Sequence, residues 1–321
     1  MEWAIGVDGG GTHTRAVLVD AEGVVQEVRF GGCGNFQRIG TNGLQLLLDQ
    51  LLPPLSAQAE SQNVALCLAL AGAGRSAEQQ EIAEMVKRIG WSNSVRVESD
   101  ARAALEGAHG GAPGLVVIAG TGSIVLGKND RGELARAGGW GPLLGDEGSG
   151  YYLGLQALQA TTRYLDGAGP ETELVEALAM ALDLEGWDGL VPEVYGGKID
   201  RGRIATLGPI VSDVATRGDA VAAEIVDRAG TALGGQVAAV AQRLGLLEDV
   251  SISFMGGVFA EEGLFARTIL RNVRSRTGVV RLRPALLPAA MGAVLLAWEN
   301  TTAAPDGQRL AQLRVGRPDG L

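Results

Sequence analysis

Apolar runs and short glycine-rich breaks alternate over the first thirty residues of the chain. Three runs of six or seven residues, WAIGVD, RAVLVD and VVQEVRF, are rich in β-branched side chains. The breaks between them are GGGTHT and DAEG. This pattern is typical of strands joined by turns, and DAEG predicts a tight hairpin. We therefore expect three short strands between residues 3 and 30.

The pattern then changes to alternating helices and strands. An amphipathic helix is predicted over residues 40–52, closed by Pro53-Pro54, because proline cannot continue a helix. The apolar strand VALCLALAGAG, a helix over residues 77–89 and the strand VRVES follow. Such alternation favours an α/β sheet covered on both faces.

The opening pattern recurs at residue 114. The stretch GLVVIAGTGSIVLGKNDRGELARAGG is again strand, Gly-Thr turn, strand, charged turn and strand. Thr12 precedes the turn glycine Gly23 by the same eleven positions that separate Thr121 from Gly132. Because the similarity occurs twice, it predicts two related domains rather than a solenoid.

We place the domain boundary near Ala112-Pro113, giving domains 1–112 and 113–287. The second half is mostly helical, with helices predicted over 147–165, 171–182, 204–216 and 220–244. The strand SISFMGG, a helix, the strand VVRLRP and a final helix over 288–299 complete the pattern. Residues 301–321, with two Pro, three Gly and several charges, predict a poorly ordered tail.

Composition narrows the class of protein. Hydrophobic residues make up 46% and charged residues 20%, as in globular proteins. The 49 glycines are about twice the usual share and cluster in loops. A net charge of -10 without a basic run argues against nucleic acid, but not against a phosphate held by backbone N–H groups.

Cysteine content and hydropathy indicate where the protein works. Cys33 and Cys67 are far apart in sequence, so a disulfide framework or metal cluster is not expected, and a reducing cytosol fits. No signal-like apolar core starts the chain, and no apolar run reaches membrane length. We expect a cytoplasmic protein without a membrane partner.

The motif GVDGGGTHT is the first candidate site. A strand ending in Asp8, followed by glycines and Thr12, places several N–H groups and a hydroxyl where phosphate oxygens can bind. Asp8 could hold Mg²⁺ through water, since this ion prefers oxygen ligands and keeps part of its hydration. The alternative is an ordinary hairpin turn.

The motif AGTGS, residues 119–123, is the corresponding turn of the second repeat. Alone it could be only a turn. Two Gly-Thr hairpins at matching places in duplicated domains would face each other across an interdomain cleft, which favours a paired phosphate clamp.

Asp100, in VESDARAALEGA, lies where a strand ends and a helix begins. A carboxylate at the carboxyl end of a sheet strand can serve as a general base on a bound ligand. Alternatively, Ser99 or Asp100 is simply the cap of the following helix.

The stretch AGGWGPLLGDEGSGYYLG, residues 137–154, predicts a rigid loop with an aromatic face and a carboxylate. These groups suit a sugar, whose hydroxyls pair with Asp146 while its apolar face rests on Trp140. Asp146 could instead cap the next helix, and Trp140 could fill the core.

The pair Gly256-Gly257 follows a buried strand and would allow close approach of a flat ring such as adenine, or could form a strand-to-helix turn. The remaining candidates receive no role. His109 is expected to face solvent in a loop, His13 stands alone, and both cysteines are interpreted as buried small apolar residues.

Taken in order, these motifs resemble one family. GVDGGGTHT, Gly34-Asn35, SDA at 99–101, GTGS and above all GGWGPLLGDEGSG are similar to the N-acetylglucosamine kinase group of the BadF/BadG/BcrA/BcrD ATPases. That group lies within the superfamily of sugar kinases, actin and heat-shock chaperones. The resemblance implies an α/β fold of two duplicated ribonuclease H-like domains, with mixed sheets flanked by helices and an interdomain cleft. The final helix, about 288–300, would join the first domain.

The resemblance also implies roles for single residues and for ligands. Asp100 would take the proton from a sugar hydroxyl, O6, as this attacks the γ-phosphate of ATP, and Asp8 would lie near Mg²⁺. Phosphate-binding residues would be Gly10, Gly11, Thr12, Thr121 and Gly122, with Gly256 and Gly257 at adenine. Sugar-binding residues would be Asn35, Asp100, Ser123, Gly139, Trp140, Gly141 and Asp146. A homodimer is implied as well.

One departure leaves the sugar open. Animal N-acetylglucosamine kinases resemble GTGSN at the second turn, where this chain has Ile124. Glucosamine, N-acetylmuramic acid or glucose are therefore alternative acceptors. An ATPase activator of radical enzymes would need cluster-binding thiolates, and residues 128–165 contain no cysteine. A non-catalytic sugar sensor is the other alternative.

Overall fold

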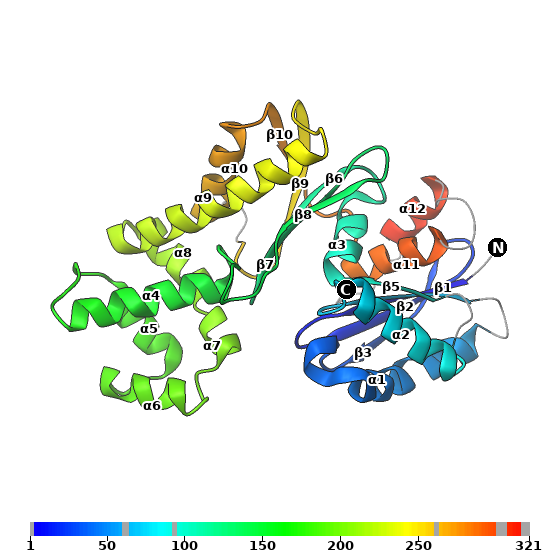
Figure 1. The fold of residues 1–321 in the computed structure, drawn as a ribbon, viewed down its shortest axis with the longest axis horizontal. Helices are drawn as coiled ribbons and strands as arrows, with labels where there is room; N and C mark the ends of the chain where they lie inside the picture. The colour runs from blue at the N-terminus through cyan, green and yellow to red at the C-terminus, as the bar shows by residue number, and fades with distance from the viewer. Residues whose placement is uncertain (1–2, 60–63, 92–94, 260–262, 300–306, 316–321) are drawn as a thin grey trace. The chain divides into compact units, whose positions relative to one another are not determined.

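The computed structural model describes residues 3–59, 64–91, 95–259, 263–299 and 307–315. The chain forms two compact units (Figure 1). Unit 1 comprises Met1–Pro113 and Pro284–Leu321, and unit 2 comprises Gly114–Arg283. Each unit is built on one five-stranded sheet.

The sheet of unit 1 has the strand order β3-β2-β1-β4-β5. The first three strands form an antiparallel meander, and β4 and β5 run parallel to β1. Their bounds are Trp3–Gly9 (β1), Thr14–Val19 (β2), Val25–Gly31 (β3), Val64–Leu70 (β4) and Val95–Ser99 (β5). All five strands predicted from the sequence in this unit are confirmed.

Alternating side chains of this sheet enter two different cores. Ile5 and Val7 pack with the helices α1 (Phe36–Gln58) and α2 (Ser76–Arg88). Ala4 packs on the other face, with α3 (Asp100–His109) and α11 (Ala289–Glu299). Figure 1 shows these two helix layers on either side of the sheet. Helix α11, which was predicted over 288–299, thus belongs to unit 1, although all of unit 2 separates it in sequence from the first part of that unit.

Helix α1 is longer than predicted. It begins at Phe36, bends at Gly40, where φ is 63°, and continues through both prolines to Gln58. A proline removes one backbone donor, but a helix can tolerate this where tertiary packing compensates. Here the turn beyond the prolines places Leu55 in the core with no exposed surface, so burial outweighs the lost hydrogen bonds.

Two further expectations for unit 1 are corrected. The predicted tail contains helix α12 (Gly307–Val315), whose Leu313 is fully buried against α11; the rest of that tail lies outside the described residues. His109 is not a solvent-facing loop residue, because it is the last residue of α3 and is 7% exposed. Both Leu313 and His109 are buried by contacts with segments that lie far away in the sequence.

The sheet of unit 2 repeats this topology, with the order β10-β9-β6-β7-β8. Strands β6, β7 and β8 form the antiparallel meander, and β9 and β10 are parallel to β6. Their bounds are Gly114–Ala119 (β6), Ser123–Lys128 (β7), Leu134–Gly138 (β8), Asp249–Met255 (β9) and Val279–Leu282 (β10). The duplication inferred from the spacing of the Gly-Thr turns is thereby confirmed.

The helices of unit 2 form most of its core. They are α4 (Gly150–Leu165), α5 (Leu174–Leu182), α6 (Leu190–Tyr195), α7 (Arg201–Ala205), α8 (Gly208–Arg217), α9 (Ala220–Arg243) and α10 (Leu264–Arg274), with a 3-10 turn at Trp187–Gly189. None of the helices within the described ranges is long and apolar enough to cross a membrane.

One predicted helix, 204–216, is two helices in the structure. Helix α7 ends at Ala205 and α8 starts at Gly208. The break coincides with a close contact to α4, since a Cβ on Gly208 would lie 2.7 Å from the Cα of Gly150. The break separates the short helix α7, whose Arg201 contacts the carbonyl of Thr121 in the second Gly-Thr turn.

Candidate functional site

The first Gly-Thr turn, residues 10–13, is held in place by backbone contacts. The N–H of Gly10 donates to the carbonyl of His13, and the N–H of Gly34 donates to the carbonyl of Gly10. The guanidinium of Arg38 donates to the carbonyl of Gly11 at 3.0 Å. Gly11 and Thr12 are exposed. The turn is therefore rigid at its base and open at its tip, as a phosphate-binding turn requires.

Two carboxylates lie at the carboxyl ends of β1 and β5, two parallel strands of the unit 1 sheet. Asp8 is near the end of β1, and Asp100 directly follows β5; β4 lies between these two strands. Burial, followed by the charge of Asp100, raises the pKa of Asp8 to about 7, although Arg15 opposes this rise. Burial also raises the pKa of Asp100, against the N–H groups of Asp100 and Ala101. Asp8 is thus poised to accept a proton or a cation near neutral pH, and Asp100 holds a proton more strongly than an exposed aspartate does.

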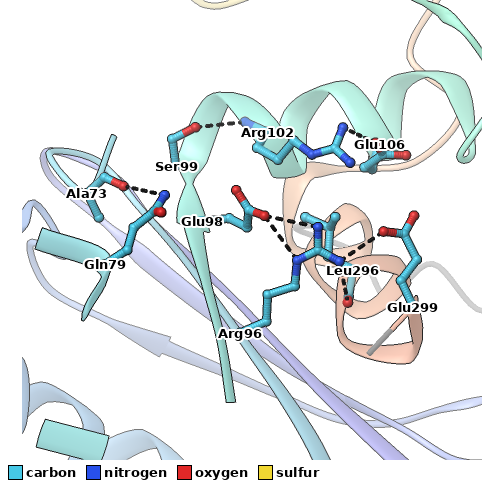
Figure 2. A network of polar contacts seen from close by, with 9 residues as sticks. All are labelled: Ala73, Gln79, Arg96, Glu98, Ser99, Arg102, Glu106, Leu296 and Glu299. Atoms are coloured by element: carbon cyan, nitrogen blue, oxygen red, sulfur yellow. Dashed lines mark hydrogen bonds and ion pairs between the residues drawn. The ribbon is translucent and has the colours of Figure 1, made fainter. Parts of the chain in front are cut away.

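Ser99, and not Asp100, is the cap of helix α3. Its side chain accepts the backbone N–H of Arg102 at 3.2 Å (Figure 2). Asp100 is the first residue of the helix and accepts the N–H of Ala101. The capping alternative for Asp100 is therefore corrected, and its carboxylate is left for other chemistry.

An ion-pair network ties β5, the strand that precedes Asp100, to helix α11. The Arg96 guanidinium binds Glu98 on the same strand, and on α11 it binds the carbonyl of Leu296 and the carboxylate of Glu299 (Figure 2). The Glu98 carboxylate points toward this cation. Helix α11 is thus tied to β5, the strand that ends just before Asp100.

Asn35, predicted to contact a sugar, has a local structural role. Its side-chain oxygen accepts the N–H of Gln37 at 3.0 Å and caps α1. The cap uses one acceptor site of the side chain, and a contact of Asn35 with a sugar stays a prediction.

The second Gly-Thr turn, residues 120–122, lies against the glycine-rich loop that follows β8. The N–H of Gly150 donates to the carbonyl of Gly120 at 2.7 Å, and the N–H of Gly139 donates to the carbonyl of Ser123. A Cβ on Gly122 would lie 2.9 Å from the carboxylate of Asp146. The glycine at this position therefore makes room for the acid.

Asp146 is the centre of this arrangement. It is 3% exposed and has φ of 60°, a conformation that Asp and Asn adopt more readily than other residues with a side chain. Its carboxylate accepts the N–H of Gly141 at 3.2 Å and binds the Arg201 guanidinium at 3.0 Å. Burial raises the pKa of Asp146, which Arg201 and the N–H groups of Gly141 and Ser123 oppose. Helix α4 is capped by Ser149, so Asp146 is not its cap.

Arg201 was not found by sequence analysis. It is the first residue of the short helix α7 and lies 55 positions from Asp146 along the chain. Its Nη2 also approaches the carbonyl of Thr121 at 3.4 Å, and its guanidinium lies 5.6 Å from the ring centroid of Tyr151. The sequence carries no signal for this pair, because Arg201 precedes the predicted helix 204–216 and meets Asp146 only through the fold.

The loop itself explains the glycine content of AGGWGPLLGDEGSG. Gly138, Gly139 and Gly141 all have φ near +70° to +84°, which residues with a side chain rarely adopt. Trp140 is 62% exposed, so it does not fill the core, and the Arg136 guanidinium lies 5.2 Å from the centroid of its ring. The loop thus presents an indole face at the surface.

Ser123 and Ile124, at the start of β7, contact the loop and hold it in place. Ser123 is buried, and its hydroxyl donates to the carbonyl of Glu147 at 2.8 Å. The side chain of Ile124 occupies the space where a Cβ of Gly139 would lie, at 2.9 Å. Both residues therefore shape the loop, and a direct contact of Ser123 with a sugar stays a prediction.

The Gly256-Gly257 pair follows β9 as expected. Gly256 has φ of 110°, and a Cβ there would lie 2.3 Å from the carbonyl of Ala119 at the end of β6. Gly256 therefore has a packing reason of its own. Gly257 is exposed with open space around it, which leaves its role at adenine a prediction.

The cysteines differ in burial, and the described residues form no cluster of metal ligands. Cys67 is fully buried as expected, but Cys33 is only partly buried. Within the described ranges, no group of three or more His, Cys, Asp and Glu side chains could hold a metal ion. A cation at Asp8 would therefore take most of its ligands from water or a bound phosphate.

The two duplicated sheets with their glycine-rich turns define an α/β protein of the actin and hexokinase-like fold. The crystal structure of a protein from Chromobacterium violaceum, provisionally named an N-acetylglucosamine kinase, is similar to this chain with a TM-score of 0.71 and 27% sequence identity. The similarity covers 92% of this chain and 99% of the Chromobacterium chain. Residues 5–297 match the BadF/BadG/BcrA/BcrD ATPase family. The chain belongs to this family, as the motifs predicted.

Two relatives are similar over nearly their whole length. The N-acetylmuramic acid/N-acetylglucosamine kinase of Clostridium acetobutylicum is 31% identical over 92% of this chain and 98% of its own. The N-acetyl-D-glucosamine kinase of Dictyostelium discoideum is 30% identical over 91% of this chain and 97% of its own.

Proposed function

We propose that this protein is an ATP-dependent sugar kinase that phosphorylates N-acetylglucosamine at O6. The observation that carries the proposal is the Asp100 carboxylate, which follows β5 at the same end of the sheet as Asp8, has a raised pKa and is not needed as a helix cap. Membership of an ATPase family and near full-length similarity to two N-acetylglucosamine-phosphorylating relatives support the choice of reaction.

In this proposal Asp100 is the general base. It takes the proton of the sugar hydroxyl as the hydroxyl oxygen forms a bond to the γ-phosphorus of ATP and the bond to the β-phosphate oxygen breaks, releasing ADP. A carboxylate with a raised pKa holds this proton more strongly than an exposed aspartate does. The N–H groups and hydroxyls of the turns, at Gly10, Gly11, Thr12, Thr121 and Gly122, would hold the phosphates. That both turns serve one nucleotide stays a prediction.

Mg²⁺ is the expected metal. Asp8 fits it, because a buried carboxylate with a pKa raised to about 7 gains from a nearby cation, and Mg²⁺ needs only one or two protein carboxylates besides water and phosphate. When bound, the ion would neutralise charge on the phosphates of ATP.

Sugar recognition is assigned to the loop of unit 2. Asp146 would accept hydrogen bonds from sugar hydroxyls, and Trp140 would pack on the apolar ring face, with Gly139, Gly141, Ser123 and Asn35 as further lining. N-acetylmuramic acid is one alternative acceptor, because it is part of the name of the Clostridium relative. Glucosamine and glucose are the other acceptors that the sequence left open. A homodimer and a cytoplasmic location remain predictions from sequence.

The test is an ADP-release assay with Mg-ATP and a panel of sugars. The panel contains N-acetylglucosamine, N-acetylmuramic acid, glucosamine, N-acetylmannosamine, glucose and a control without sugar. We expect the strongest stimulation with N-acetylglucosamine and a product phosphorylated at O6, identified by ³¹P and ¹H NMR. Stimulation by another sugar would change the substrate but keep the reaction. ADP release that no sugar stimulates would contradict the kinase assignment.

A further inference from the structure

Arg201 makes contacts that an ordinary surface arginine does not. Its side chain is 44% exposed, yet its Nη2 binds a carboxylate that is almost fully buried. The same atom approaches the carbonyl of Thr121 in the second Gly-Thr turn, and the guanidinium lies over the ring of Tyr151 at the start of α4. The arginine is therefore held by three separate segments of unit 2.

The buried acid needs this partner. A buried carboxylate with φ of 60° is costly in both solvation and backbone conformation, and two N–H groups compensate only in part. Arg201 supplies the only full positive charge that faces it in the described part of the chain, while the neighbouring Glu147 raises its pKa. Removing Arg201 would leave Asp146 buried and without a counter-charge.

We propose that Arg201 is a positioning residue for sugar recognition, which acts by holding the Asp146 carboxylate, ionised and correctly oriented, against the second Gly-Thr turn. The inference rests on the proposed function. Arg201 itself need not touch the sugar. Through the carbonyl of Thr121 it also joins the proposed sugar-binding acid to the proposed phosphate-binding turn.

The experiment is a mutant cycle measured with the sugar that the wild type uses. Arg201→Gln should raise the KM for sugar about tenfold to a hundredfold, the range for loss of a hydrogen bond to a charged group, and change the KM for ATP much less. Arg201→Lys, which keeps the charge, should restore part of the loss. Asp146→Asn tolerates the positive φ and removes the carboxylate. The double variant should match Asp146→Asn alone, since Arg201 acts only through Asp146.

A pH profile supplies a readout that a merely structural role would not move. Because the opposite charge of Arg201 lowers the pKa of Asp146, its removal raises this pKa further. The acid limb of kcat/KM for sugar should then shift to higher pH in Arg201→Gln. Arg203→Gln is the matched control, since Arg203 lies on the same helix and binds a carboxylate, that of Asp183. It should leave both the KM and the profile unchanged.

Several outcomes would overturn the inference. An unchanged sugar KM in Arg201→Gln would do so, as would equal losses in Arg203→Gln. A double variant clearly worse than Asp146→Asn, or a loss confined to ATP, would mean that Arg201 contacts a ligand directly. A wild type that no sugar stimulates would instead contradict the proposed function. Melting temperatures of all variants identify a misfolded protein, in which case Arg201→Lys carries the test.

Discussion

The hairpins that carry the two Gly-Thr turns share a framework but differ in charge. In each, the last residue pair before the turn contains a buried hydroxyl. Thr14 donates to the carbonyl of Gly32, and Ser123 donates to the carbonyl of Glu147, both at 2.8 Å. The same hydrogen bond thus ties each turn to the segment that follows its third strand.

The preceding residue pair is where the hairpins diverge. It is Asp8 opposite Arg15 in unit 1, and Ile118 opposite Ile124 in unit 2. Unit 1 therefore has a carboxylate at its turn, with Asp100 as an unfavourable neighbour. Unit 2 has an apolar pair at that level, and its carboxylate, Asp146, comes from the loop and is matched by Arg201. The duplicated scaffold therefore carries a poorly compensated acid in unit 1, where we propose the chemistry, and a compensated acid in unit 2, where we propose sugar recognition.

The largest effect is expected from Asp100→Asn. The variant keeps the size of the side chain and the Ser99 cap but cannot take a proton, so kcat should fall at least about a hundredfold, the scale of general-base loss. Steady-state kinetics with Mg-ATP and the preferred sugar measure this. Glu27→Gln, whose carboxylate binds Arg29 on the same strand β3, is the control and should retain activity. A variant that keeps most of its turnover would exclude Asp100 as the base.

Gly122→Ala should have the next largest effect. Its methyl group would lie 2.9 Å from the Asp146 carboxylate, and such crowding costs about 1–3 kcal/mol. We expect a lower melting temperature and a higher KM for sugar. Gly120→Ala is matched to it, because a Cβ at Gly120 has no atom within 4 Å, and should melt close to the wild type. Equal losses in both would mean that the turn, and not its contact with Asp146, is sensitive.

Asp8→Asn should have a smaller effect on stability than Gly122→Ala and in the opposite direction: it should stabilise the protein above neutral pH. With a folded pKa of about 7 against 3.8, the acid is protonated in the fold where the unfolded chain is already ionised, so its penalty grows between about pH 4 and pH 7. The variant should melt at least about 2 °C higher than the wild type at pH 8, the effect of roughly 1 kcal/mol. The gain should be smaller at pH 5. A lower melting temperature at pH 8 would show that Asp8 is stabilised as an anion.

The smallest effects are expected from Thr14→Val and Ser123→Ala. Each removes the hydrogen bond that ties a turn to the following segment, worth about 1 kcal/mol. Denaturant titration should show similar losses for both. Only Ser123→Ala should also raise the KM for sugar, through the loop that contains Asp146. If Thr14→Val raised it equally, the two hairpins would not divide chemistry and recognition as described.

Much of the fold and the outline of the site could be predicted because they depend on local pattern. The ten strands were located from apolar runs between glycine-rich turns, and the duplication from a spacing of eleven residues. The positive φ values of Gly138, Gly139 and Gly141 agree with the rigid loop expected from their sequence. The same motifs were sufficient to identify the family, which the match over residues 5–297 confirms.

The remaining features depend on contacts between residues far apart in sequence. Helix α1 passes through two prolines because Leu55 is buried beyond them, and His109 is buried because the chain beyond unit 2 returns to pack on α3, with the N–H of Leu286 bound to the carbonyl of Ala108. The choice of Ser99 over Asp100 as a cap is a matter of side-chain direction. Arg201 meets Asp146 across 55 residues. Sequence alone determined which residues could carry charge and which backbone needed glycine; tertiary structure decided which charges are compensated, because pairing and burial are properties of the packed chain.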